Sequence, residues 1–144
     1  MKVSREQAAH NRERVVEAAA QLFRQRGFDG IGVADLMKEA GLTHGGFYGH
    51  FSSKEDLIAE ASARALAGSL ASLSEVADRA SRDPLSAVAA AYLSTAHRDN
   101  PGAGCVLAAL GPDASRQGPA VRRAVNDRAL SQEILDAGLA SVKT

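Results

Sequence analysis

Residues 33–51 read VADLMKEAGLTHGGFYGHF and contain two short helical patterns on either side of a glycine. In the first pattern, apolar residues recur with the spacing of one helix face, at Val33, Leu36, Met37 and Ala40. Gly41 ends this helix and opens a three-residue turn. Thr43 closes the turn and is a suitable N-cap for a second short helix over residues 44–50. Three glycines weaken the second helix, so packing through Phe47 must hold it.

The sequence on both sides of this stretch predicts further helices. Residues 11–26 carry an apolar face and a basic last turn, and Gly27 follows as a left-handed cap. Ser53 is placed to cap a long helix that begins at Lys54. Asp83 and Pro84 start another helix. No stretch alternates with the period of two that a half-buried strand requires, so the sequence predicts an all-α fold.

Two later segments give more detailed expectations. An apolar stripe predicts one continuous helix that buries Leu85, Val88, Ala89, Tyr92, Leu93 and Ala96. The compact apolar run of residues 105–110 is followed by Gly111 and Pro112, which we expect to end that segment. Gly118-Pro119 then opens the last helical region.

Composition excludes several classes of protein. The 144 residues are 45% hydrophobic and 24% charged, which is ordinary for a folded domain and argues against global disorder. We find neither a run of 18 apolar residues nor a secretory signal, so we expect no membrane span and no secretion. A single cysteine cannot form an internal disulfide, so we expect a reducing cytoplasm. The formal net charge is zero, so the overall basic field of many nucleic-acid binders is missing.

Two short helices joined by a tight turn match the requirements of a helix-turn-helix. In that motif the second helix lies in the major groove of DNA, and here its exposed ridge comprises Thr43, His44, Gly45, Gly46, Tyr48, Gly49 and His50. Gly45 and Gly46 allow a close approach to the groove, and Lys54 supplies a cation to a flanking phosphate. Arg12 and Arg14 either contact phosphate or form a solvated face. The alternative for the whole segment is a small bundle whose short helix merely packs.

Residues 12–61, RERVVEAAAQLFRQRGFDGIGVADLMKEAGLTHGGFYGHFSSKEDLIAEA, resemble the N-terminal domain of the tetracycline-repressor (TetR) family of bacterial regulators. The resemblance implies a homodimer, a palindromic double-stranded DNA operator and repression that a small-molecule effector relieves. By position, the family's DNA contacts fall on Thr43, His44, Tyr48, His50 and Lys54. Gly32 departs from the family, which often has Ser or Thr there as a cap and phosphate contact. Gly46 and Gly49 also replace positions that often carry side chains.

The resemblance divides the chain into a DNA-binding domain over residues 1–53 and a helical ligand-binding and dimerisation domain over residues 54–144. The second domain is short for the family, and we expect several dozen residues to be missing between about Arg123 and Asn126. Without its dimer helices the chain would expose apolar faces of the remaining core. Two functions therefore stay open: a ligand-gated dimeric repressor, or a truncated helical interaction protein without operator binding.

Candidate ligand contacts lie in the second domain. Cys105 lies in a segment that resembles one in family members whose cysteine senses electrophiles or oxidants, while the alternative is a small buried side chain. No Lys, Arg or His lies within six residues of Cys105, so a lowered thiol pKa needs help from elsewhere in the fold. Tyr92 and His97 belong to the helix that lines the effector cavity in the family, with core packing and surface exposure as their alternatives. The sequence predicts no cofactor, metal site or catalytic site.

Overall fold

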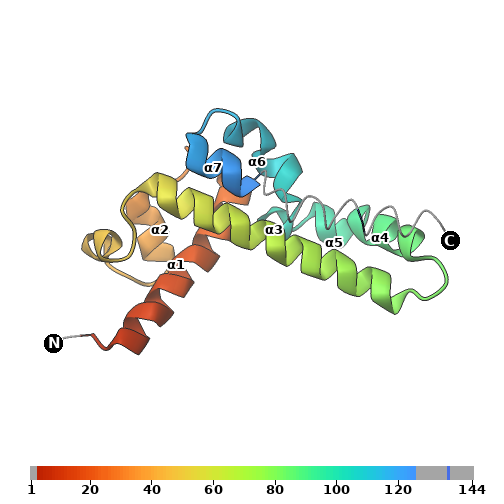
Figure 1. Cartoon of the computed structure of the whole chain (residues 1–144), viewed down its shortest axis with the longest axis horizontal. Helices are drawn as coiled ribbons and strands as arrows, with labels where there is room; N and C mark the ends of the chain where they lie inside the picture. The colour runs from red at the N-terminus through yellow and green to blue at the C-terminus, as the bar shows by residue number, and fades with distance from the viewer. Residues whose placement is uncertain (1–2, 126–135, 137–144) are drawn as a thin grey trace.

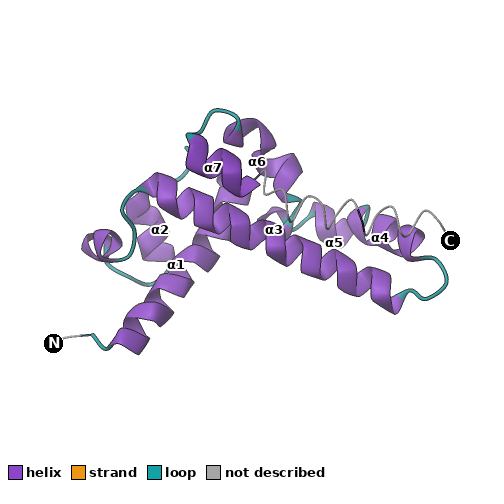
Figure 2. Cartoon of the chain, viewed as in Figure 1, coloured by secondary structure: helices purple, strands orange, loops and turns teal. Residues whose placement is uncertain are grey.

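All secondary structure in the described part of the chain, residues 3–125 and residue 136 of the computed structural model, is helical. Figure 2 shows helices joined by short loops without a strand in these ranges. This confirms the predicted all-α fold. The predicted gap between Arg123 and Asn126 lies at the edge of the described residues, and its far side is outside them. Among the described helices, none combines the length and the apolar character that a membrane span needs.

The first helix, α1 (Arg5–Arg26), begins six residues earlier than its apolar face predicts. Ser4 is its N-cap, and the Ser4 hydroxyl accepts a hydrogen bond of 3.1 Å from the Gln7 amide. The helix ends at Gly27, which has a φ of +75°, a region that L side chains rarely adopt. The buried face of α1 comprises Val15, Val16, Ala19, Ala20, Leu22 and Phe23.

Two short helices follow, α2 (Val33–Glu39) and the 3₁₀ helix η1 (His44–Gly49). They pack against each other, and α2 also packs against α1. Four apolar residues of this unit are buried, namely Leu36, Met37, Ala40 and Phe47. Val33 and Leu42 are partly buried against the same cluster. The apolar spacing therefore identified the packed face of this unit.

The longest of the described helices, α3 (Lys54–Arg79), runs from the neighbourhood of α2 to α4 (Figure 1). As predicted, Ser53 caps it, with a 3.1 Å hydrogen bond from the Asp56 amide to the Ser53 hydroxyl. The helix packs against α1 and three later helices. Its buried side chains end at Leu66, and Leu70, Leu73 and Ala77 in the distal half of the helix are not buried.

The predicted continuous helix from residue 85 to 96 is wrong. The structure has α4 (Pro84–Tyr92), a break, and α5 (Thr95–Arg98). Ser94 explains the break, because its hydroxyl accepts from the His97 amide at 3.1 Å and donates to the Ala91 carbonyl at 2.7 Å. None of the α4 side chains is buried, and the main packing partner of α4 among the described elements is α3.

The remaining elements are η2 (Pro101–Ala103), α6 (Val106–Ala114) and α7 (Pro119–Val125). The expectation that Gly111 and Pro112 end the apolar run is wrong, because α6 continues through both. Leu110 and Ala114 lie four residues apart on one face and are both buried, which offsets the single backbone donor that Pro112 lacks. Helices α6 and α7 cover α3 near its N-terminal end (Figure 1).

Candidate nucleic-acid interface and the neighbouring cavity

Gly41 sets the geometry of the turn between α2 and η1. Its φ is +71°, and its amide donates to the Lys38 carbonyl at 2.9 Å. A Cβ at this position would lie 2.6 Å from the Arg14 Nη2 atom, so the Arg14 side chain covers the turn. The next amide, that of Leu42, donates back to the Met37 carbonyl at 2.8 Å. The turn therefore requires glycine for its backbone conformation, whereas the exposed end of the Arg14 side chain could move aside.

The third helix of the motif is a 3₁₀ helix in the structure. Thr43 occupies the N-cap position as predicted, but its side chain makes no capping hydrogen bond. A 3₁₀ helix, which is more tightly wound than an α-helix, suits this segment because its three glycines provide no side chains to pack against one another. Phe47 anchors this segment in the core. Its side chain is fully buried, and its ring stacks on that of Phe51 with centroids 5.4 Å apart.

The outward side of η1 presents the predicted ridge. Tyr48 is 72% exposed, and Thr43, His44, Gly45 and Gly49 are also exposed. A Cβ added at Gly45 or Gly49 would meet nothing within 4 Å. Figure 1 shows this segment projecting at one end of the molecule, beyond α2. An open surface here allows another macromolecule to approach the backbone closely.

Two of the predicted ridge residues differ from the others. Gly46 and His50 are half-buried. A Cβ at Gly46 would lie 3.6 Å from the Met37 methyl carbon, so Gly46 faces α2 and not the open side. Gly46 therefore brings η1 close to α2, and its close approach to a groove stays a prediction.

Lys54 lies at the start of α3 and holds the chain that leads into α2. Its ammonium donates to the Ile31 carbonyl at 2.7 Å. The following residue, Gly32, is the N-cap of α2 and has no side chain that could cap the helix. A Cβ added at Gly32 would meet nothing within 4 Å. Lys54 and Gly32 thus lie next to each other in space, although 22 positions separate them in sequence.

Arg12 is engaged within the fold. Its two terminal nitrogens each donate to one carboxylate oxygen of Glu60 at 2.5 Å. The guanidinium carbon also lies 4.7 Å from the centre of the Phe51 ring. The Glu60 carboxylate raises the pKa of Arg12 above its ordinary value, chiefly through these hydrogen bonds and against a small cost of burial.

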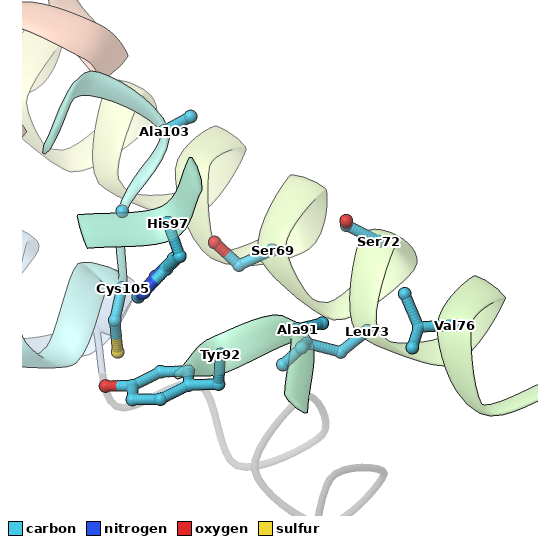
Figure 3. A pocket seen from close by; sticks show the side chains of 10 residues that line it. Ser69, Ser72, Leu73, Val76, Ala91, Tyr92, His97, Ala103 and Cys105 are labelled. Atoms are coloured by element: carbon cyan, nitrogen blue, oxygen red, sulfur yellow. The ribbon is translucent and has the colours of Figure 1, made fainter. Parts of the chain in front are cut away.

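A cavity of about 150 Å³ lies outside the helix-turn-helix, between α3, α4 and the η2 segment (Figure 3). Tyr92, His97 and Cys105 lie together on one side of it, and the α3 side chains Ser69 and Leu73 lie on the other. The Tyr92 and His97 rings are 4.6 Å apart. Tyr92 is therefore not a buried core residue, and His97 is not free on the surface, because the two rings contact each other at the cavity.

Cys105 is half-buried at the N-cap position of α6. Burial by itself disfavours the thiolate, but the nearby amides of Ala108 and Leu107 and contact with the Tyr92 hydroxyl favour it, and the net effect lowers the pKa of Cys105. The same contact raises the pKa of Tyr92. No cation lies near Cys105 in the sequence. The groups that lower the pKa of its thiol belong to the first turn of α6 and to Tyr92, 13 residues away.

The wall of this cavity touches α1. Arg24 donates from Nη1 to the Gly104 carbonyl at 3.3 Å, and Gly104 lines the cavity beside Cys105. Nearby, the Asp113 carboxylate accepts from the Phe28 amide at 3.3 Å. Sequence reasoning missed both contacts, because each joins residues at least 80 positions apart and neither belongs to a motif. Among the described residues there is also no group of His, Cys, Asp and Glu that could hold a metal ion.

Comparison with known proteins places the N-terminal unit. Residues 15–61 match the family model described as bacterial regulatory proteins, tetR family. The chain is 33% identical over 57 residues to the HTH-type transcriptional regulator AcrR of Shigella flexneri, a match that covers 40% of this chain and 26% of the relative. It is 37% identical over 54 residues to the HTH-type transcriptional repressor KstR2 of Mycolicibacterium smegmatis, covering 38% and 26%. The chain thus spans about a quarter of the length of the curated relatives it matches.

The helical arrangement beyond residue 61 also has a counterpart. The structure superposes on that of a TetR-family transcriptional regulator from Agrobacterium tumefaciens with a TM-score of 0.76 and 22% sequence identity. That likeness covers 94% of this chain and 71% of the other, so the shared fold extends well past the helix-turn-helix. Residues 15–61 therefore form a domain of the tetR family of bacterial regulatory proteins.

Proposed function

We propose that the chain is a DNA-binding transcriptional regulator, most simply a repressor that a small-molecule effector releases from its operator. The observation that carries this proposal is the η1 ridge. It combines the 72% exposed Tyr48 with open glycine backbone, on a helix that the fully buried Phe47 holds in place. A helix built in this way can enter a major groove without rearranging its own core.

In this proposal the contacts divide by their position. Thr43, His44, Tyr48 and His50 reach the groove, and the backbone at Gly45 and Gly49 approaches the sugar-phosphate chain. Lys54, Arg14 and the open N-cap amides after Gly32 lie around the turn and would contact flanking phosphates. Arg12 has its terminal nitrogens on Glu60 and serves to position α1.

The operator would be palindromic, because a homodimer of such heads reads two half-sites about one turn of DNA apart, roughly 34–36 Å. The effector would occupy the cavity beside Tyr92 and Cys105, whose wall contacts α1 through Arg24. The protein would act in the cytoplasm, where it meets the DNA.

The exposed apolar side chains favour a second candidate, a helical interaction protein without operator binding. Leu85 is 58% and Leu93 is 81% exposed, and both lie in or directly after α4, which buries none of its side chains. Sedimentation together with DNA titration separates the two functions. A dimer that binds duplex DNA supports the repressor, and a chain that assembles but ignores DNA supports the alternative.

The direct test uses a labelled duplex from the region upstream of the gene, titrated with protein and followed by fluorescence anisotropy. Replacing Tyr48 with alanine should weaken binding, while Leu107→Ala, which truncates an exposed apolar side chain of α6, should leave binding intact. Equal affinities for the native protein and the Tyr48 variant would refute the groove assignment.

A further inference from the structure

A second cavity, of about 270 Å³, lies between α1, α3 and η2. It shares three lining residues, Ser69, Ser72 and Ala103, with the cavity beside Tyr92. The two cavities are therefore neighbours along one face of α3. They differ in character, because the first is bordered by Leu73, Val76 and aromatic rings, whereas Arg24 and Arg64 line the second.

Arg24 is the unusual residue of the second cavity. Its guanidinium is half-buried and uses two of its five donors, on the Ala20 carbonyl at 2.9 Å and the Gly104 carbonyl at 3.3 Å. Among the described residues, no carboxylate lies within ion-pair distance of it. Burial, only partly opposed by the charge of Glu17, lowers the pKa of Arg24. A cation held in this way, with free donors directed at a cavity, gains most from an anionic ligand.

Arg64 on the opposite wall is already neutralised. It donates to the Glu13 carboxylate at 2.6 Å and lies 3.9 Å from that of Glu17. Glu17 also lines the cavity and would oppose an anion near Arg64. The position for a negative charge is therefore next to Arg24, with the Ser69 and Ser72 hydroxyls on α3 as further donors.

We propose that the two neighbouring cavities form one amphipathic site for an organic carboxylate. The carboxylate lies against Arg24, and the apolar body extends along α3 toward Leu73 and Tyr92. This assignment names the chemical class of the effector and in that sense rests on the proposed function. Arg24 belongs to α1 and donates a hydrogen bond to Gly104 on the cavity wall, so a carboxylate bound to its free donors acts on a residue that joins α1 to the segment after η2.

The test compares two probes of equal shape, 3-phenylpropionate and 3-phenylpropanamide, by isothermal titration calorimetry on the full chain. We expect the acid to bind about tenfold or more tightly than the amide, since a charge-assisted hydrogen bond is lost in the amide. Arg24→Gln should remove the preference for the acid, and Arg24→Lys should keep part of it. The matched control is Arg26→Gln, two positions further along α1 and exposed, which should leave the preference unchanged.

Equal affinities of the native chain for acid and amide, or no binding of either, would overturn the proposal without the need for any variant. So would a loss of acid preference in Arg26→Gln equal to that in Arg24→Gln. DNA binding measured without either probe separates this result from the proposed function. A chain that binds DNA but does not prefer the acid refutes only the carboxylate site. A chain that prefers the acid but ignores DNA retains the site and refutes the regulator.

Discussion

Arg12 on α1 and Glu60 on α3 form a two-pronged ion pair across 48 positions of sequence, with both nitrogen–oxygen distances at 2.5 Å. Their side chains are 37% and 35% exposed, so water weakens the pair without removing it. The Phe51 ring beneath the guanidinium adds a third contact. The pair joins the helix that starts the chain to the helix that leaves the helix-turn-helix.

Arg12→Ala should lower the free energy of unfolding by roughly 1 kcal/mol, as expected for a bidentate but partly hydrated pair with a ring contact. Chemical denaturation measures this change. A double-mutant cycle with Glu60→Ala should give a coupling energy of about 0.5–1 kcal/mol that shrinks in high salt. A coupling of zero would mean that Arg12 is free in solution and available for phosphate.

Lys54 has three donors and gives one to the Ile31 carbonyl, which leaves two for DNA. Lys54→Ala should therefore weaken binding to all duplexes and reduce the slope of log affinity against log salt by about one. It should also cost about 1 kcal/mol of stability through the lost Ile31 bond.

The control for this change is Lys38→Ala, which removes the same charge from the exposed last turn of α2. Its salt slope should remain that of the native chain. If both variants reduce the slope equally, the effect of Lys54 is one of general charge, and the specific phosphate contact is refuted.

The glycines of the turn and of η1 should respond differently to alanine. Gly45→Ala and Gly49→Ala add a methyl group to open space at negative φ, so stability should change by less than about 0.5 kcal/mol. Binding to DNA should nevertheless weaken, because the added methyl group faces the groove. Gly41→Ala should instead cost about 1–2 kcal/mol of stability from its φ of +71°, and more if Arg14 cannot move. Unimpaired DNA binding by both η1 variants would show that η1 does not approach the duplex closely.

Sequence patterns located the helix-turn-helix well because its determinants are local. Apolar spacing identified the buried face that includes Leu36 and Met37, and Gly41 identified the turn. The start of α1 was missed because apolar spacing was the signal used to find helices. Its first turns are polar and have no apolar period, although Ser4 and Gln7 carry the spacing of a helix cap.

The candidate cavity was only partly predictable. The resemblance pointed to Tyr92 and Cys105, but the sequence placed Tyr92 on a helix that continues to residue 96, and the Ser94 cap ends that helix. The Arg24–Gly104 contact depends on how α1 and η2 pack, and no local spacing encodes it. Apolar periodicity likewise predicts a buried face on α4 even where the described part of the chain has nothing to cover it.

Thiol alkylation reports on Cys105 alone, because it is the only cysteine of the 144 residues. Donors at the start of α6 and the Tyr92 hydroxyl favour the thiolate more than burial disfavours it, so the pKa of Cys105 lies below its ordinary value. Alkylation by iodoacetamide follows the thiolate fraction, so the rate should reach half its maximum at a lower pH than for a cysteine in a short peptide. Tyr92→Phe removes one donor and keeps the ring, and it should move this midpoint upward. Ser72→Ala, which alters the same cavity without touching the sulfur's donors, should leave the midpoint in place. A midpoint at or above the peptide value would mean that burial dominates and that the Tyr92 hydroxyl does not reach the sulfur in solution.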